Sequence, residues 1–378
     1  MKKKIFYWAP YLTKIATIKA VLNSLISLKK YGSEYEICLI DAVGEWSEHQ
    51  SILEKYQVRV VRLSKYNLFK YLPKRGYFQS RISLIFQIII CFIPLLIILK
   101  KEKPIFFIAH LNTAIIMLLS NFFLKTKFIL RISGYPKLHF MRKFIWSFFS
   151  KNLKLITCPT TETKNFLLKN NIFYKKKIFV LKDPILNFDD IFPLNQNKIS
   201  SDKKIILAIG RLTKQKNFSF LIDCFHKITL KYPNEFKLII LGEGEKKKEL
   251  SNLIKKLNLK DVRLEGYKSN VYDYYKSCFC FILSSLWEDP GFVLVEAAFA
   301  NAPIISSNCP NGPSEFIGQN EAGYIYESNN SNSFLNTFDN FYNTPEKQKL
   351  NKKIIAKKKT KMYTKFKHYK NLHKILSI

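Results

Sequence analysis

The chain has 378 residues, more than one ordinary domain needs, and its length suits two domains. Hydrophobic residues make up 47% of the sequence, which excludes a disordered or fibrous protein. The 62 Lys and Arg residues outnumber the 28 Asp and Glu residues, giving a net charge of +34. This excess favours a nucleic acid or an acidic membrane surface as partner, although compositional drift toward Lys, Ile and Asn produces the same excess.

The first half alternates between strand-like apolar runs and segments with helical spacing. The N-terminal run after Met1 breaks at Pro10, so it is interpreted as a first buried strand and not as a signal peptide. In chain order we expect a strand over 4–8, a helix over 13–31, strands over 35–40 and 58–63, a helix over 82–99, a strand over 104–109, a helix over 114–123, strands over 127–132 and 153–158, and a helix from Thr161.

The segment from Ile82 to Leu99 carries no charge and approaches the length that spans a bilayer. Gln87, Pro94 and the strand-like run over 105–108 argue against a span, which would also interrupt the α/β alternation. A buried or membrane-surface helix is the preferred interpretation, with a transmembrane helix as the alternative.

A Pro- and Asn-containing linker over 186–202 separates a domain over 1–185 from a second domain over 203–345, and 346–378 is expected to be a basic helix or tail. In the second domain we expect strands over 205–209, 237–241, 262–266, 280–283 and 303–306, and helices over 217–232, 245–257, 271–276 and 292–301. The alternation predicts an α/β protein with two Rossmann-like, doubly wound domains, whose ligands bind where the strands' carboxyl ends face a central cleft.

The seven cysteines include no CxxC pair, and Cys278 and Cys280 are too close in sequence for a zinc site or a disulfide framework. We therefore predict no cysteine zinc site and expect buried free thiols in a reducing cytoplasm.

Two glycine-containing loops follow strands in the second domain. Gly210 permits a tight turn, and Arg211 and Lys216 place two cations before a helix N-terminus, an arrangement that suits a diphosphate. Gly242 follows the next strand, where the absence of a side chain lets the backbone approach a ligand. Each motif alone is also compatible with an ordinary solvated turn.

A third motif runs from Trp287 to Glu296 between a strand and a helix. Glu288 lies at the helix start, and Glu296 lies within an apolar helix, where its carboxylate needs a partner. Sugar or ribose hydroxyls would supply one, and a pairing with Lys or Arg is the structural alternative. Gly291 frees backbone NH groups for an anion at the helix N-terminus.

The spacing of Glu288 and Glu296, with Gly-Arg-Leu-x-x-x-Lys-Asn upstream and Cys-Pro-Asn-Gly-Pro-Ser-Glu over 309–315 downstream, resembles family 4 retaining glycosyltransferases. The resemblance covers residues 203–320 and extends to bacterial enzymes that build surface glycans and lipid-linked oligosaccharides. It implies the GT-B fold, a UDP- or GDP-linked sugar as co-substrate, no cofactor and no metal.

The resemblance also implies roles for residues. Arg211 and Lys216 would hold the donor diphosphate, Glu288 would contact the transferred sugar, and Glu296 would bind ribose. The predicted catalytic residues are Arg211, Lys216 and Glu288, and the predicted donor-binding residues add Gly210, Gly242, Tyr267, Gly291, Phe292, Val293 and Glu296.

The N-terminal half departs from the family pattern, because the loop over 10–17 lacks a glycine and the stretch over 130–137 lacks a histidine. Arg81, His110 and Arg131 are the residues expected on the acceptor side, with Lys74 as a further phosphate contact. A structural role is the alternative for His110.

Basic and aromatic residues are interleaved over 66–81 and 141–151, a pattern that suits an anionic membrane interface or, alternatively, an aromatic core with solvated lysines. We therefore expect a peripheral enzyme on the cytoplasmic face of the inner membrane, with a lipid-linked or lipopolysaccharide glycan as acceptor. A nucleotide-sugar 2-epimerase is the alternative enzyme. Nucleic-acid binding is disfavoured because no recognisable module accompanies the charge.

Overall fold

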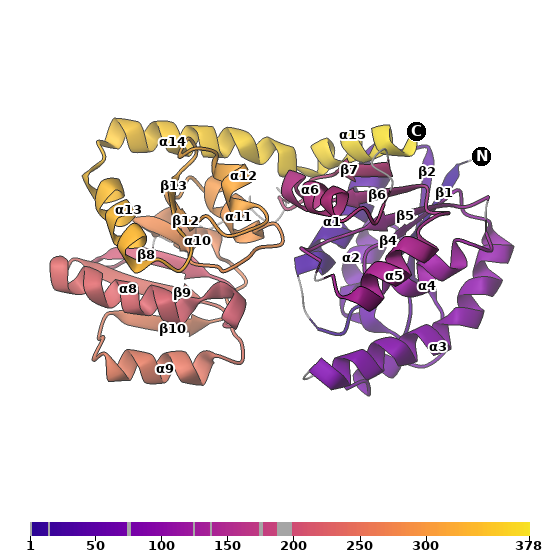
Figure 1. The fold of residues 1–378 in the computed structure, drawn as a ribbon, viewed down its shortest axis with the longest axis horizontal. Helices are drawn as coiled ribbons and strands as arrows, with labels where there is room; N and C mark the ends of the chain where they lie inside the picture. Colours follow the sequence, from indigo (N-terminus) through magenta and orange to yellow (C-terminus); the bar gives the residue numbers. More distant parts are fainter. Residues whose placement is uncertain are drawn as a thin grey trace. The chain divides into compact units, whose positions relative to one another are not determined.

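The chain forms two compact units, residues 1–185 with 364–378 and residues 186–363 (Figure 1). The predicted C-terminal segment 346–378 is thus divided between the two units. Most of the predicted linker lies outside the described residues. The computed structural model describes residues 2–13, 16–73, 77–123, 125–136, 138–173, 177–186 and 199–378.

Unit 1 is built on a parallel sheet of seven strands in the order β3-β2-β1-β4-β5-β6-β7. Because helices cover both faces, the inner strands are continuous apolar runs, and β4 and β6 are buried along their whole length. The strands are β1 (Lys3–Trp8), β2 (Tyr35–Asp41), β3 (Arg59–Arg62), β4 (Phe106–Ala109), β5 (Lys127–Arg131), β6 (Leu155–Cys158) and β7 (Ile178–Val180).

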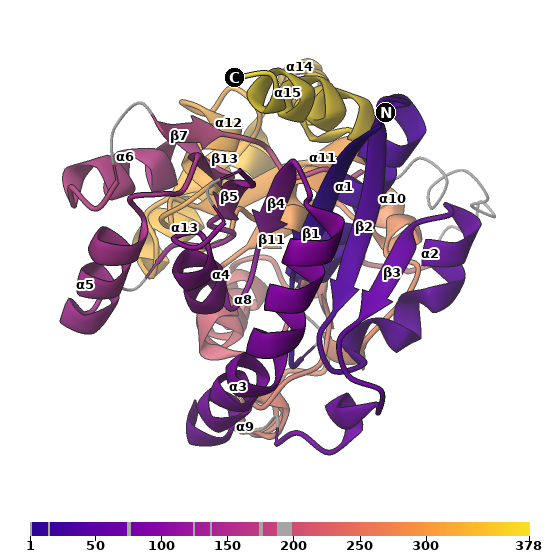
Figure 2. The ribbon, with the colours of Figure 1, turned by 90° about the vertical axis from the view of Figure 1, so that its right-hand side faces the viewer.

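The helices of unit 1 form two separate layers (Figure 2). One layer is α1 (Ala16–Tyr31), α2 (Gln50–Lys55) and α15 (Lys365–Leu376), which share a buried cluster with one face of the sheet. The other layer is α3 (Tyr77–Glu102), α4 (Thr113–Leu119), α5 (Phe140–Phe149) and α6 (Thr161–Lys169). Short 3-10 helices, η1 (Glu45–His49) and η2 (Leu68–Lys70), complete the unit.

Helix α3 includes the uncharged segment noted in the sequence and extends it at both ends. By length and composition it could cross a membrane, but Cys91, Leu95 and Leu99 are buried in the core of unit 1. The helix therefore lies along the sheet with one side packed and the other exposed.

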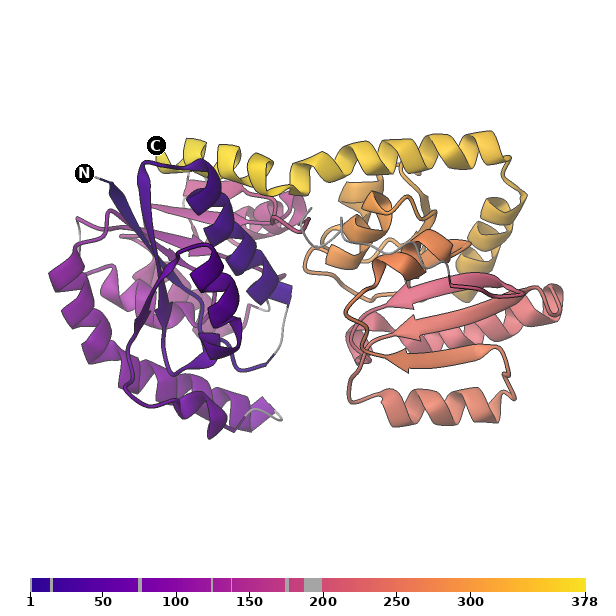
Figure 3. The ribbon, with the colours of Figure 1, turned by 180° about the vertical axis from the view of Figure 1, so that it is seen from behind.

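Unit 2 repeats the architecture with a parallel six-stranded sheet in the order β10-β9-β8-β11-β12-β13 (Figure 3). The carboxyl ends of all six strands meet at one edge, which is where the predicted donor residues lie. The strands are β8 (Lys204–Ile209), β9 (Phe236–Leu241), β10 (Val262–Gly266), β11 (Cys280–Leu283), β12 (Ile304–Ser307) and β13 (Tyr324–Tyr326).

Alternating side chains along β11 separate the two helix layers of unit 2. Cys280 and Ile282 belong to the cluster formed with α8 (Phe218–Lys231), α9 (Lys247–Lys256) and α13 (Ser331–Asn343). Phe281 points the other way, and its ring packs against Tyr275 of α10. The remaining elements are η4 (Lys214–Lys216), α10 (Tyr272–Ser277), α11 (Phe292–Phe299), α12 (Pro313–Ile317), α14 (Glu346–Lys359) and η5 (Thr360–Tyr363).

Candidate active site

The strand order of unit 2 reverses between β8 and β11. The chain leaves β8 through α8 toward β9, and it leaves β11 through α11 toward β12 on the opposite side. The loops after these two neighbouring strands diverge, and in open α/β sheets a ligand binds at such a switch point. The loop after β8 carries Arg211 and Lys216, and the loop after β11 carries Glu288, so three predicted residues meet there.

An ion pair joins the two loops. The Lys216 ammonium lies 2.6 Å from Oε1 of Glu288, and the same oxygen accepts a hydrogen bond from the Ser285 hydroxyl at 2.5 Å. The side chain of Lys216 is 12% exposed and that of Glu288 is 5% exposed. The structure thus brings together two of the three predicted catalytic residues in a nearly dry environment.

Further hydrogen bonds fix the backbone of both loops. The Ser284 hydroxyl donates to the carbonyl oxygen of Lys216 at 2.7 Å, and the Gln215 side-chain amide donates to the carbonyl oxygen of Trp287 at 3.0 Å. The Asn311 side-chain amide donates to the carbonyl oxygen of Glu288 at 2.8 Å. The sequence analysis did not identify Ser284, Gln215 or Asn311, although polar residues directly after a strand at a switch point are a usable signal.

Glycines allow neighbouring loops at this edge to touch. Gly242 has φ of +139°, and a Cβ atom there would lie 1.9 Å from the carbonyl oxygen of Gly210. Gly210 in turn lies under Lys216, whose Cε atom would be 2.9 Å from an added Cβ. Only glycine fits both positions, and the contact seats the Lys216 side chain.

Helix α11 begins at this edge. Gly291, with φ of +89°, precedes Phe292 and Val293, the first residues of the helix, whose backbone NH groups lie in its first turn. The hydroxyl of Tyr275 donates to the carbonyl oxygen of Val293 at 3.0 Å, which anchors that turn.

Glu296 lies in the second turn of α11 and is 9% exposed. Burial, followed by the charge of Glu296, raises the pKa of the Tyr275 hydroxyl well above its usual value. The buried carboxylate of Glu296 therefore lies close to the Tyr275 hydroxyl.

Arg211 and Tyr267 differ from these buried groups because both are exposed at the same edge. Arg211 follows β8 and makes no ion pair with any other residue that the structure describes. Tyr267 follows β10 and is 77% exposed, so its ring is accessible to a flat ligand such as a base.

In unit 1, Arg131 is engaged inside the protein. Its side chain is 2% exposed, and its guanidinium donates to the Asp183 carboxylate at 2.6 Å and to the carbonyl oxygen of Leu181 at 2.7 Å. These contacts argue for a structural role, in contrast to the acceptor contact that the sequence suggested.

His110 directly follows β4, the strand next to β1 at the point where the strand order of unit 1 reverses. Its ring stacks on Tyr7 with centroids 5.9 Å apart, and burial, with the charge of Arg131, lowers its pKa well below the usual value. The Nδ1 atom of His110 has no hydrogen-bond partner among the described residues. Arg81 lies elsewhere, exposed near the start of α3, and Lys74 lies outside the described residues.

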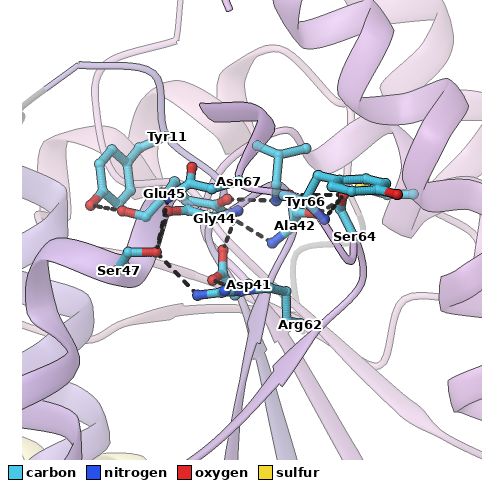
Figure 4. A network of polar contacts seen from close by, with 12 residues as sticks. Tyr11, Asp41, Ala42, Gly44, Glu45, Ser47, Arg62, Ser64, Tyr66 and Asn67 are labelled. Atoms are coloured by element: carbon cyan, nitrogen blue, oxygen red, sulfur yellow. Dashed lines mark hydrogen bonds and ion pairs between the residues drawn. The ribbon is translucent and has the colours of Figure 1, made fainter. Parts of the chain in front are cut away.

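A buried carboxyl pair, Asp41 and Glu45, lies at the end of β2 and in the loop after it in unit 1 (Figure 4). Asp41 accepts hydrogen bonds from the backbone NH of Gly44 at 2.8 Å and from Nε of Arg62 at 3.0 Å, and Glu45 accepts from the backbone NH of Val43 at 2.8 Å. Burial, reinforced by the neighbouring Asp41, raises the pKa of Glu45 well above its usual value. The sequence analysis did not identify this pair, which fixes the loop at the carboxyl edge of the sheet.

No group of three or more His, Cys, Asp or Glu side chains suited to a metal ion occurs within the part of the chain that the structure describes.

The chain has two doubly wound units, each built on a parallel sheet, and unit 2 has a switch point that suits a phosphate. These features define the GT-B fold predicted from the sequence. Comparison with solved structures confirms the fold. An Anabaena protein crystallised with UDP and glucose superposes with a TM-score of 0.74 at 14% identity, covering 100% of both chains.

Residues 192–361 match the family model described as glycosyl transferases group 1, which confirms the predicted resemblance to a glycosyltransferase family over that part of the chain. An uncharacterized glycosyltransferase of Methanocaldococcus jannaschii is 35% identical over 58% of this chain and 59% of its own length. A Campylobacter jejuni N-acetylgalactosamine-N,N'-diacetylbacillosaminyl-diphospho-undecaprenol 4-alpha-N-acetylgalactosaminyltransferase is 30% identical over 63% of this chain and 65% of its own length. The chain thus spans about three fifths of these relatives.

Proposed function

We propose that this protein is a glycosyltransferase that transfers a sugar from a nucleotide-sugar donor, with retention and without a metal ion, to a growing bacterial surface glycan. The observation that carries the proposal is the Lys216–Glu288 ion pair at the switch point of the family-matched unit. The acceptor is a lipid-linked or lipopolysaccharide glycan, and the enzyme works as a peripheral protein on the cytoplasmic face of the inner membrane.

The donor diphosphate binds near the cations of the loop after β8. Arg211 is exposed and Lys216 is seated on Gly210, so both can contact phosphate oxygens, while the first NH groups of α11 add further donors. As the bond to the sugar breaks, negative charge accumulates on the leaving nucleoside diphosphate. The nearly buried ammonium of Lys216 stabilises that charge, with the exposed Arg211 adding to it, which is how the reaction proceeds without a metal.

Glu288 and Glu296 orient the two ends of the donor. Glu288 accepts hydrogen bonds from hydroxyls of the transferred sugar, and Glu296 accepts them from the ribose. Tyr267, exposed beyond β10, lies against the base. Support for a UDP-linked donor comes from the Anabaena structure with UDP and glucose, and support for an undecaprenyl-diphosphate-linked acceptor comes from the name of the Campylobacter relative.

The test is thermal-shift binding of the purified chain to UDP- and GDP-sugars, repeated on Lys216→Ala and Glu296→Ala. One donor at 100 times its Kd stabilises the wild type by about 2.7 kcal/mol. For a unit of this size that is a rise in Tm of about 5–11 °C. Lys214→Ala is the matched control, because Lys214 is an exposed lysine two positions away.

The expected result is stabilisation by one sugar nucleotide in the wild type and in Lys214→Ala, and none in the other two variants. Transfer to an undecaprenyl-diphosphate-linked glycan in the presence of EDTA then checks the reaction, and NMR of the product checks retention. Absence of stabilisation by every sugar nucleotide contradicts the proposal. Donor conversion without any acceptor favours an epimerase instead.

A further inference from the structure

Helix α3 exposes a continuous apolar stripe. Ile85, Ile89 and Ile93 are 57%, 68% and 64% exposed, and they recur every four residues along one side of the helix. Phe86 widens the stripe, and Ile82 and Ile97 extend it at its two ends. Contiguous exposed apolar residues on this scale mark an interaction surface and are not the scattered apolar residues of an ordinary surface.

The polar side chains of α3 between Ile82 and Leu99 lie on its buried side, among apolar residues such as Cys91 and Leu95, and its exposed side carries apolar residues. Ser83 and Gln87 are fully buried, and the Ser83 hydroxyl donates to the carbonyl oxygen of Pro73 at 2.7 Å. Neither the nitrogen nor the oxygen of the Gln87 side-chain amide has a hydrogen-bond partner within the described residues. A helix facing water has the opposite arrangement, with polar residues outward. The reversed pattern fits a helix whose outer side contacts an apolar medium.

Neighbouring helices in the same layer of unit 1 also expose apolar residues. Helix α5 exposes Phe140, Phe144 and Phe148, again four residues apart, and Phe122 projects from the end of α4. Helices α3, α4 and α5 share one buried cluster beneath this surface, and Figure 2 shows them in the same layer. We call the exposed apolar residues of α3 and α5, with Phe122, the apolar face.

The charge of the segment that carries the apolar face indicates its partner. Between Leu63 and Thr161 the sequence carries sixteen Lys and Arg residues and one acidic residue, Glu102, which is bound by Lys4 and Arg59. A second copy of the chain would bring the same excess of cations against itself. An anionic phospholipid surface complements both the apolar residues and the surrounding cations.

We infer that the apolar face lies in an anionic phospholipid bilayer, with α3 parallel to the membrane plane and its isoleucines below the headgroups. The apolar face is the surface through which the protein would bind the membrane. Only the choice of the cytoplasmic leaflet rests on the proposed function. Exposed Lys100 and Lys143, on α3 and α5, reach the lipid phosphates. The packing of Cys91 in the core of unit 1 argues against a span, because crossing would remove Cys91 from that core.

The experiment is flotation of the full chain with vesicles of phosphatidylglycerol and phosphatidylethanolamine, compared with phosphatidylcholine alone. The wild type should float with the anionic vesicles. The double variant Ile89→Ser, Ile93→Ser should lose at least tenfold in the lipid partition coefficient. Leu230→Ser is the matched control, because Leu230 is 72% exposed on α8 of unit 2, and it should float like the wild type. Donor-induced thermal shifts in all variants confirm that they remain folded.

Equal flotation of the wild type and the double variant would overturn the inference. So would retention of the chain in membranes after carbonate extraction, which indicates a span, or a lipid-free dimer that the double variant abolishes. If the wild type binds vesicles but shows no donor-induced thermal shift, the proposed function is refuted and the inference about the membrane surface still holds.

Discussion

Replacing Lys216 with Met removes the cation of the Lys216–Glu288 ion pair and keeps most of the side-chain volume. The Glu288 carboxylate then remains buried. Of its two side-chain partners described above, Lys216 and Ser285, it keeps only the Ser285 hydroxyl. Removing one partner of a buried ion pair costs about 3–5 kcal/mol. Because Lys216 is slightly exposed and Ser285 remains, we expect the lower end, about 3 kcal/mol. In a unit of this size that lowers Tm by about 6–12 °C.

The measurement is urea and thermal unfolding of the full chain, followed by circular dichroism, with the transition of unit 2 assigned by its response to nucleotide sugar. The double variant Lys216→Met, Glu288→Gln removes both charges and should recover most of the loss. With the single variant Glu288→Gln measured as well, the cycle should give a coupling energy of about 2 kcal/mol. If the single and double variants unfold alike, the pair is not a buried ion pair and the reasoning fails.

Three further predictions concern other buried contacts. Gly242→Ala should weaken donor binding at least tenfold by calorimetry, because its Cβ would meet the Gly210 carbonyl oxygen at 1.9 Å; unchanged affinity would contradict this packing. Arg131→Met should cost about 3–5 kcal/mol of stability by leaving Asp183 unpaired, whereas adding Asp183→Leu should restore much of it in the same urea titration. Burial lowers the pKa of His368 from 6.5 to about 4, so the unfolded state binds more protons between these values and stability should fall by about 3 kcal/mol as pH drops from 6.5 to 4. His368→Asn should flatten that pH dependence, and an unchanged slope would exclude His368 as its source.

The elements of unit 2 were predictable because local patterns and the global fold agree there. Strands such as Lys204–Ile209 are apolar runs of the length that a covered parallel sheet needs, and each ends at a glycine or a polar turn. The place of the loops that carry Lys216 and Glu288 was predictable for the same reason, because the carboxyl ends of parallel strands converge on one edge.

The contacts that complete the site were not predictable from local pattern. Ser284 and Asn311 act through backbone carbonyls of another loop, and nothing in their own neighbourhood specifies those partners. Arg131 was misleading for a related reason. A cation at the end of a strand suggests a ligand, but Asp183, fifty-two residues later, occupies its guanidinium.

Helix α5 was described from sequence only as a basic and aromatic stretch, because its buried side is provided by half-buried Trp146 and Ile145 and not by a regular aliphatic stripe. The C-terminal segment was predicted as one helix or tail. Its division between units depends on long-range packing of α15 against α1, which leaves no mark in the local sequence.

The return of α15 to unit 1 determines the order in which the chain can be completed during synthesis. Leu372, Ile375 and Leu376 fill the same buried cluster as α1, yet they leave the ribosome only after all of unit 2. The unit whose first strand is made earliest is therefore finished last, and until then the α1 side of its core is open to solvent. Unit 2 is continuous in sequence, so it can fold before α15 completes the core of unit 1.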